Sequence, residues 1–326
     1  MTTPGDPVEP GRRGGAGDVN KANPRSAAPS HTGDADGSSD PTYTIVSFHA
    51  HPDDEALLTA GSLAKAAAAG HRVVIVVATA GEAGLAAAGR QDTGDHSGDP
   101  GVEGRDGGGG SLGERRIGEL NASARAIGCT RVVLLGYADS GYHGEQSADP
   151  VSFARADLEV AARRLAAVLD EEAADVVTIY DPAGGYGHAD HVQVHRVGVR
   201  AAALAATPVV LEATIDRELL RRVAAVVKRL QWIAPGLDIP DLDQSYTARR
   251  DLTHRIDVRE FLVAKRAAIA AHSSQATSDS GTRLLQLLLR LPRPVFRLVC
   301  GTEWFVERGR PPGAQPSTDL FASLPE

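Results

Sequence analysis

Short apolar segments and longer amphipathic segments alternate along most of the chain. The short segments are rich in β-branched residues and almost continuously apolar, as in parallel strands that are buried on both faces. They occupy residues 43–50, 72–80, 131–138, 175–182 and 208–215. Between them, segments rich in Ala, Leu and Arg predict helices at residues 54–69, 113–127, 153–174 and 191–206. Gly70 and Gly128 follow the first two of these helices, as C-terminal capping glycines do.

This alternation predicts an α/β fold with a Rossmann-like, doubly wound, mainly parallel sheet and helices on both faces. Three segments interrupt the pattern. They are a long Gly/Asp-rich loop at 89–113, one further amphipathic helix at 216–233, and a short strand followed by a helix at 253–272. The apolar run at 283–299 is compatible with either core packing or a subunit contact.

The two ends of the chain differ in composition from the part between them. Residues 1–42 are rich in Gly, Pro, Ser and Asp and contain almost no large apolar side chain, so they cannot offset the entropy lost on folding. We therefore expect a disordered N-terminal tail at 1–42, a single domain at 43–310 and a flexible C-terminal tail at 311–326.

Composition narrows the class of protein further. The 326 residues carry a formal net charge of −8 and no dense basic run, so a nucleic-acid partner is not expected. Cys129 and Cys300 are too few for a disulfide framework, which indicates buried thiols in a reducing compartment. No apolar run reaches the length of a membrane span and no secretory signal is evident, so we expect a cytoplasmic protein.

Four of the predicted strands are followed directly by ionisable residues. These are His51, Asp53 and Asp54 after the first strand, Glu82 after the second, Asp139 after the third, and His188, Asp190, His191 and His195 after the fourth. Open parallel sheets bind their ligands at the carboxyl ends of the strands. We therefore expect these side chains to converge on one site.

The spacing within the first and last of these groups is typical of a metal site. His51 and Asp54 are three residues apart at a strand-to-helix turn, and His188 and His191 are three apart at the start of a helix. One imidazole and one carboxylate from the first group, with one imidazole from the second, would leave a fourth position for water, as in catalytic zinc sites. The set contains no thiolate, so Fe(II), Mn(II) or Co(II) is also compatible with it.

The three consecutive acids at 53–55 fit the same interpretation. A divalent cation beside them would offset their mutual repulsion. Asp54 would bind the cation, and Asp53 would take a proton from the metal-bound water. Glu55, which opens the helix, is expected to interact with the N-terminal dipole and free N–H groups. Taken alone, the string HPDDE could instead be a turn with an Asp N-cap.

The segments HAHPDDE (49–55) and GYGHADHVQVH (185–195) resemble the GlcNAc-phosphatidylinositol de-N-acetylase (LmbE-like) family. RRIGEL (115–120) and GYADSG (136–141) further resemble the members of this family in the mycothiol pathway. The resemblance covers residues 43 to about 205. It implies a zinc-dependent amidohydrolase that removes an acetyl or another N-acyl group from a small amino-sugar substrate.

The resemblance also assigns roles to matching positions. His51, Asp54 and His191 match the zinc ligands, and Asp53 matches the general base. His188, as imidazolium, would stabilise the oxyanion or protonate the leaving amine, with Asp190 orienting it. Tyr186 would polarise the amide carbonyl. Arg116 and Asp139 would hold sugar hydroxyls, whereas His272, in a segment that resembles one near the family's C-terminus, receives no role.

Alternative interpretations stay open for some of these residues and for the function. Tyr186 could pack in a Gly-rich turn, Arg116 and Asp139 could form surface ion pairs, and His195 is better explained as a supporting or core histidine than as a ligand. The same site could serve a thiol-conjugate amidase or a natural-product deacylase, and a homo-oligomer is allowed. A sugar- or nucleotide-binding protein without turnover is disfavoured, because three acids would repel a pyrophosphate.

Overall fold

The apolar segments form a seven-stranded sheet in the computed structural model, which describes residues 41–81, 112–141, 152–229, 245–272, 280–313 and 315–325. The strands are β1 (Thr44–His49), β2 (Arg72–Thr79), β3 (Arg131–Tyr137), β4 (Val176–Tyr180), β5 (Val209–Thr214), β6 (His254–Asp257) and β7 (Thr302–Glu307). Their order across the sheet is β3-β2-β1-β4-β5-β7-β6. Strands β1 to β5 pair in parallel, while β7 is antiparallel to both of its neighbours. The predicted Rossmann-like, mainly parallel fold is confirmed.

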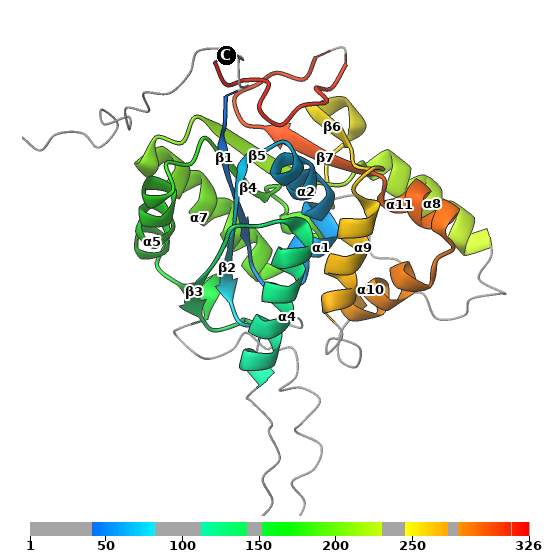
Figure 1. Cartoon of the computed structure of the whole chain (residues 1–326), viewed down its shortest axis with the longest axis horizontal. Coiled ribbons are helices and arrows are strands. Elements are labelled where there is room, and N and C mark those ends of the chain that lie inside the picture. Colours follow the sequence, from blue (N-terminus) through cyan, green and yellow to red (C-terminus); the bar gives the residue numbers. More distant parts are fainter. Residues whose placement is uncertain are drawn as a thin grey trace, which may run out of the picture. The chain divides into compact units, whose positions relative to one another are not determined.

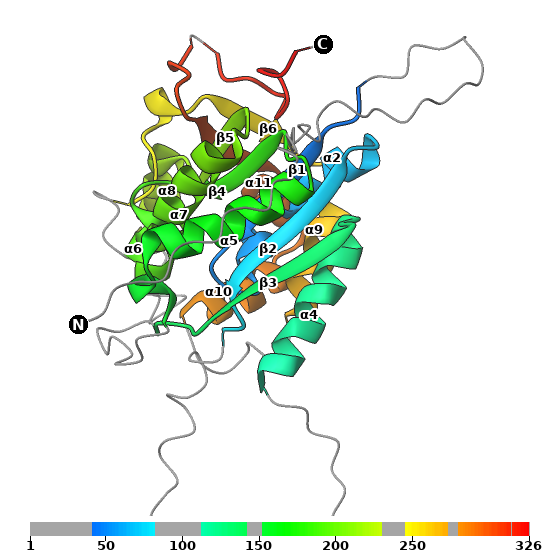
Figure 2. The same ribbon diagram turned by 90° about the vertical axis from the view of Figure 1, so that its left-hand side faces the viewer.

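Helices cover both faces of this sheet (Figures 1 and 2). The α-helices are α1 (Asp54–Leu58), α2 (Ala60–Ala68), α4 (Leu112–Ile127), α5 (Leu158–Glu171), α6 (Gly184–Gly187), α7 (Ala189–Ala205), α8 (Arg217–Arg229), α9 (Leu262–Ala271), α10 (Ser280–Arg290) and α11 (Arg293–Cys300). Helices α5 and α7 pack together on one face, and α1, α2, α4 and α9 pack on the other. Short 3-10 turns occur at Phe153–Arg155 and Arg249–Asp251.

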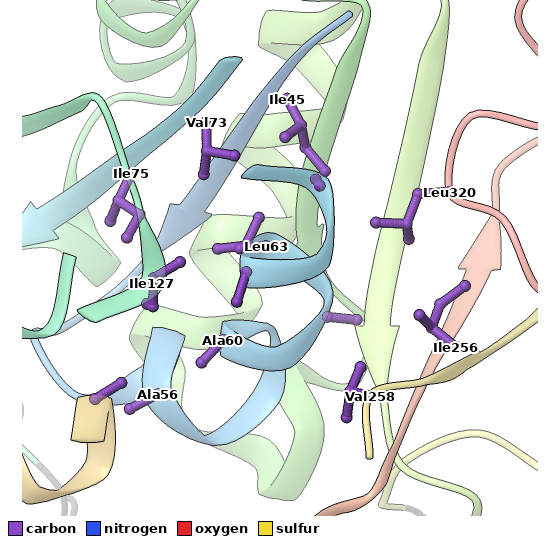
Figure 3. Close-up of a cluster of buried hydrophobic side chains, with 14 of the residues drawn as sticks. Ile45, Ala56, Ala60, Leu63, Val73, Ile75, Ile127, Ile256, Val258 and Leu320 are labelled. Atoms are coloured by element: carbon purple, nitrogen blue, oxygen red, sulfur yellow. The ribbon is translucent and has the colours of Figure 1, made fainter. Parts of the chain in front are cut away.

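The alternation of side chains along each strand divides the core into two clusters. Ile45, Val73 and Ile75 belong to the cluster under α2 and α4, which includes Leu63 and Ile127 (Figure 3). The intervening residues of the same strands belong to the cluster under α5 and α7. Strands β1 and β2 are therefore buried on both faces, which is why β2 is apolar from Val73 to Ala78 and why Ile45, Val46 and Phe48 of β1 are apolar.

The predicted helix at 54–69 is divided into α1 and α2 at Thr59, which has φ −130°. The carboxylate of Glu303 in β7 accepts hydrogen bonds from the backbone N–H groups of Gly61, at 2.9 Å, and Ser62, at 2.7 Å. Those N–H groups lie in the first turn of α2 and have no intrahelical partner. A long-range carboxylate thus starts a second helix where the local sequence predicts one continuous helix.

The C-terminal part of the chain adds elements that the apolar pattern does not resolve. The predicted strand near 253 is β6, but β7 is absent from the prediction. The run at 283–299 forms most of α10 and α11. Leu288 and Phe296 from this run are buried in the core, whereas Leu298 is 82% exposed.

The described part of the segment at 311–326 packs against the domain through two apolar residues. Leu320 and Phe321 are buried, and the Phe321 ring stacks on Tyr43 with 5.3 Å between centroids. These two apolar residues anchor a segment whose overall composition is polar. Residues 41–326 form one compact unit. The predicted N-terminal tail and almost all of the 89–113 loop lie outside the described residues.

Cys129 and Cys300 are free thiols; Cys300 is buried as expected, whereas Cys129 is only half-buried. Over the part of the chain that the structure describes, every helix is too short or too polar to span a bilayer.

Candidate metal centre and active site

The histidine-bearing segments meet at the carboxyl ends of β1 and β4. These two strands are neighbours, and the order of strands along the chain reverses between them. His51 and Asp54 lie in the turn from β1 into α1, and His188 and His191 lie at the start of α7. This is the position at which doubly wound sheets bind their ligands. The convergence expected from the sequence is confirmed for these two segments.

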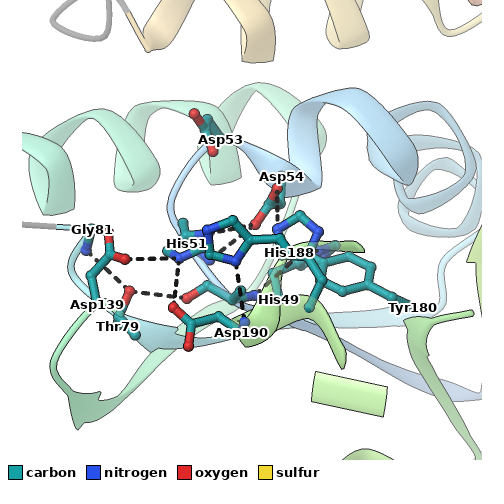
Figure 4. Close-up of polar contacts among 12 residues, drawn as sticks. His49, His51, Asp53, Asp54, Thr79, Gly81, Asp139, Tyr180, His188 and Asp190 are labelled. Carbon is teal, nitrogen blue, oxygen red and sulfur yellow. Dashed lines mark hydrogen bonds and ion pairs between the residues drawn. The ribbon is translucent and has the colours of Figure 1, made fainter. Parts of the chain in front are cut away.

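His51, Asp54 and His191 bring their potential ligand atoms within 4.8 Å of one another. Nδ1 of His51 lies 3.4 Å from Oδ2 of Asp54, and Nε2 of His191 lies 3.4 Å from Oδ1 of the same carboxylate. The backbone N–H of His51 also donates to Oδ2 of Asp54 at 3.0 Å, which fixes the carboxylate within the turn. Figure 4 shows His51 at the centre of this group, between the acids that surround it.

The charge and hydrogen bonding of this cluster fit a divalent cation. Nε2 of His191 is buried and has no hydrogen-bond partner among the described residues, a costly arrangement that ligation would relieve. Burial alone would lower the pKa of His51, but the carboxylates of Asp139, Asp190 and Asp54 raise it well above the usual histidine value. The surroundings therefore stabilise positive charge, which a metal ion would supply in place of a proton. The N/O donor set suits zinc or a harder transition metal.

Asp53 has an unusual backbone conformation for its residue type. Its φ of 115° is left-handed, and it serves as the N-cap of α1 although its carboxylate accepts no capping hydrogen bond from the helix. Such a conformation costs about 1–3 kcal/mol and persists only where the surroundings enforce it. The side chain of Asp53 is half-buried, and in Figure 4 it lies apart from the side chains of His51 and Asp54. Burial and the adjacent Asp54 carboxylate raise the pKa of Asp53 to about 7.

Glu55 occupies the N-terminal role that the sequence predicts. Its Oε2 accepts the backbone N–H of Asp53 at 2.9 Å, so the acid that opens α1 satisfies the N–H of its N-cap. The side chain is fully buried.

His188 is the N-cap of α7, and its ring lies against the cluster with 4.9 Å between its centroid and that of His191. Its Nδ1 accepts the backbone N–H of Asp190 at 3.1 Å, so the ring proton of the neutral form is on Nε2. Burial and the proximity of His51 and His191 lower the pKa of His188 to about 4. The lowered pKa favours the neutral ring, with its proton on Nε2, and the expected role of His188 as an imidazolium stays a prediction.

Asp190 contacts two histidines, His51 through its carboxylate and His188 through its backbone N–H. Its Oδ2 lies 3.2 Å from Nε2 of His51, and its carboxylate accepts hydrogen bonds from the backbone N–H and the hydroxyl of Ser140 at 3.0 and 2.6 Å. Its hydrogen bond to His188 comes from the backbone N–H. The Asp190 carboxylate therefore orients His51, and the expected orientation of His188 by Asp190 stays a prediction. The backbone contact arises because Asp190 is in the first turn of α7, where its backbone faces the N-cap.

Asp139 and Arg116, the expected sugar-binding residues, are both buried near the cluster. Oδ1 of Asp139 lies 3.4 Å from Nε2 of His51 and accepts the backbone N–H of Gly141 at 2.9 Å. Arg116 lies against Gly81, where a Cβ would come within 2.1 Å of the guanidinium Nη1. Neither is a surface ion-pair residue, and Asp139 helps to hold a candidate metal ligand.

Tyr186 lies at the solvent-exposed side of the site, and His195 lies deeper in the protein. Tyr186 is 40% exposed, and its ring centroid is 5.2 Å from that of His191, so it borders the cluster on the solvent side. Nδ1 of His195 is 3.0 Å from the carbonyl oxygen of Tyr180 and 3.7 Å from Oε1 of Glu212, which makes it a supporting residue, as expected. Glu82 lies outside the described residues.

His49 and Tyr180 are buried parts of the site that the sequence did not identify. The Tyr180 hydroxyl accepts the backbone N–H of Ala50 at 3.2 Å and lies 3.1 Å from Nδ1 of His49 (Figure 4). These contacts fix the chain directly before His51. Their positions in the sequence could have indicated this role, because His49 and Tyr180 are the last residues of the adjacent strands β1 and β4.

The chain is similar to known proteins over most of its length. A model of the family described as GlcNAc-PI de-N-acetylase matches residues 46–202. A 1D-myo-inositol 2-acetamido-2-deoxy-alpha-D-glucopyranoside deacetylase of Streptomyces griseus is 35% identical over 310 residues, covering 87% of this chain and 90% of the relative. A deacetylase of the same name from Mycobacteroides abscessus is 36% identical over 294 residues, covering 87% and 99%.

Among solved structures, the N,N'-diacetylchitobiose deacetylase from Pyrococcus horikoshii has a TM-score of 0.50 at 19% identity, covering 85% of this chain and 88% of that one. This likeness concerns the fold alone. Fold and side-chain cluster together define an α/β protein with a candidate metal site at the strand ends. With the sequence similarity over most of its length, the chain belongs to the GlcNAc-PI de-N-acetylase family.

Proposed function

We propose that this protein is a zinc-dependent N-deacetylase of a small amino-sugar substrate, with GlcNAc-inositol as the first substrate to test. The observation that carries the proposal is the His51–Asp54–His191 cluster at the carboxyl edge of the sheet. It occurs in a chain whose relatives of about one-third identity carry the name of GlcNAc-inositol deacetylases. The choice of zinc rests on the N/O donor set and on the resemblance, with Fe(II) as the alternative.

His51, Asp54 and His191 would hold the metal. When bound, it would act as a Lewis acid toward the amide carbonyl and lower the pKa of water at its open position. Asp53 would take the proton of the attacking water. His188 would donate its Nε2–H to the amide oxygen or the leaving amine, and Tyr186 would donate to the carbonyl from the solvent side.

The remaining residues would orient the substrate and the ligands. Arg116 is proposed to hold sugar hydroxyls, as the family resemblance implies. Asp139 and Asp190 would keep His51 in place through their contacts with Nε2. A cytoplasmic location and a homo-oligomer stay predictions from the sequence, which cell fractionation and light scattering would test.

The test compares metal content and acetate release between wild type and His51→Ala. We expect about one metal ion per wild-type chain and almost none in the variant. Acetate release from GlcNAc-inositol should fall by about two orders of magnitude or more. His71→Gln is the control, because His71 packs against Phe321 away from the site, and it should retain metal and activity.

Each other outcome has a defined meaning. Metal without acetate would contradict the substrate and direct the search to thiol conjugates and acylated natural products. Equal metal in wild type and His51→Ala, or none in either after reconstitution, would contradict the site itself. The HPDDE turn would then be only a helix cap.

A further inference from the structure

A buried cluster outside the metal-ligand set surrounds the carboxylate of Glu55. Oε1 of Glu55 accepts the Ser123 hydroxyl at 2.6 Å and lies 2.6 Å from Nε2 of His272. Oε2 accepts the backbone N–H of Asp53 at 2.9 Å. Glu55 and Ser123 are fully buried, and His272 is 1% exposed. Because Ser123 is in α4 and His272 directly follows α9, two helices far apart in sequence meet on one carboxylate of α1.

The geometry of the cluster places Glu55 and His272 at ion-pair distance, with 2.6 Å between Oε1 of Glu55 and Nε2 of His272 and both side chains fully buried. Nδ1 of His272 is buried without a hydrogen-bond partner in the described part of the chain, so Glu55 is its main polar contact. An apolar side chain would fill this position without that unsatisfied group, so packing alone does not explain a histidine here.

The cluster acts on the backbone of Asp53. This residue is held in a left-handed conformation that a non-glycine residue adopts only when its surroundings enforce it. Two hydrogen bonds hold this backbone: the Asp53 N–H donates to Oε2 of Glu55 at 2.9 Å, and the Asp53 carbonyl accepts the N–H of Ala56 at 3.1 Å. The direction of the Asp53 side chain follows from that backbone conformation.

We propose that Ser123 and His272 are positioning residues for deacetylation: they hold Glu55, which fixes the backbone of Asp53 and thereby directs its carboxylate. This inference rests on the proposed function only for the role of Asp53 as base. The geometry also makes a claim about the metal-free protein, namely that the conformation at Asp53 depends on two side chains from α4 and α9.

The kinetic experiment compares His272→Ala with His272→Gln, whose side-chain amide can still donate to Glu55. In His272→Ala we expect kcat for acetate release to fall about 10–100-fold, with KM within about twofold and metal content unchanged. His272→Gln should recover most of the lost kcat. Ser123→Ala should cause a smaller fall of the same kind. His254→Gln, a buried histidine in β6, is the control and should keep wild-type kcat.

A second readout needs no activity. In metal-free protein labelled with 15N-aspartate, the Asp53 amide resonance should shift in His272→Ala and return toward its wild-type position in His272→Gln. If His272→Ala does not fold, the proposal is tested with Ser123→Ala, by its kcat for acetate release and by the position of the Asp53 amide resonance.

The inference is wrong if kcat and the Asp53 resonance stay unchanged in folded His272→Ala. It is also wrong if metal content falls in parallel with kcat, or if Gln restores nothing in a folded protein. Wild type that releases no acetate from any amino-sugar amide would contradict the proposed function instead, and the resonance would still test the positioning role.

Discussion

The parallel part of the sheet and its antiparallel edge are stabilised by different kinds of buried contact. Strands β1, β2 and β4 bury mainly apolar side chains between two layers of helices, with Ser47, His49, Thr79 and Thr178 as buried polar residues. At the edge formed by β6, β7 and α9, buried charged groups are prominent: Nζ of Lys265 lies 2.6 Å from Oε1 of Glu303, and His254 is buried beside Glu307.

The two regions therefore have different roles in forming the candidate site. The parallel region carries the side chains that surround the candidate metal. The edge supplies polar groups that reach back into the first region: Glu303 caps α2, Lys265 donates to the carbonyl of Leu57 at 2.8 Å, and His272 pairs with Glu55. The edge therefore holds the divided helix α1–α2, and with it the turn that contains the HPDDE string.

The largest effect on stability should come from Glu303→Ala. It leaves the buried Lys265 ammonium unpaired and uncaps α2, so we expect a loss of about 3–5 kcal/mol in the free energy of unfolding, measured in urea. As control, Glu159→Ala breaks the pair with Arg200, whose two side chains are 42% and 43% exposed. It should cost about 1 kcal/mol or less. An equal loss in the free energy of unfolding for the two variants would contradict the conclusion that Glu303 holds α2 and Lys265 in place.

A pH dependence of stability should arise at the edge from His254. Burial lowers the pKa of His254 to about 4 in the folded protein. In the unfolded protein the pKa of a histidine is about 6.5. The unfolded state therefore binds this proton more readily. The contribution of His254 is complete above about pH 6.5 and should fall by about 2–3 kcal/mol as the pH decreases to about 4.

The check is urea unfolding of wild type and His254→Gln across this pH range. The difference between the two proteins should change with pH in the direction given. A constant difference would show that the histidine does not titrate differently on unfolding.

In the parallel region, the stability of the fold should depend on close packing rather than on charge. A Cβ on Gly198 of α7 would lie 2.3 Å from Cγ2 of Ile179 in β4. Gly198→Ala should therefore cost about 1–3 kcal/mol, although alanine favours a helix. Gly118 of α4 offers the matched control, because no described atom lies within 4 Å of a Cβ there. Gly118→Ala should gain up to about 1 kcal/mol, and thermal unfolding of both variants would show whether the signs differ.

The parallel region was predictable because its pattern is local. Continuous β-branched runs predict strands buried on both faces, and the ionisable residues after β1 and β4 predict where the site forms. The division at Thr59 was not predictable, since its cause is Glu303, more than two hundred residues away. The contact between Asp190 and His51 was hidden for a similar reason. It depends on how α7 is placed against β1 and on Ser140, which follows β3.

Strand β7 and the C-terminal segment show the same limit. Strand β7 alternates buried and half-buried residues, a weaker pattern than the apolar runs of the parallel strands. Leu320 and Phe321 are buried although they stand in a polar segment. Neighbours in three dimensions, rather than local composition, decided both cases.

The seating of the C-terminal segment also bears on self-association. Ser317 pairs with the outer side of β6: its carbonyl accepts the N–H of Arg255, and its N–H donates to the carbonyl of Thr253, both at 2.8 Å. An open strand edge is a template onto which a strand of another molecule can add. The segment that we expected to be a flexible tail thus covers the outer edge of β6, and its removal would expose that edge to strands of other molecules.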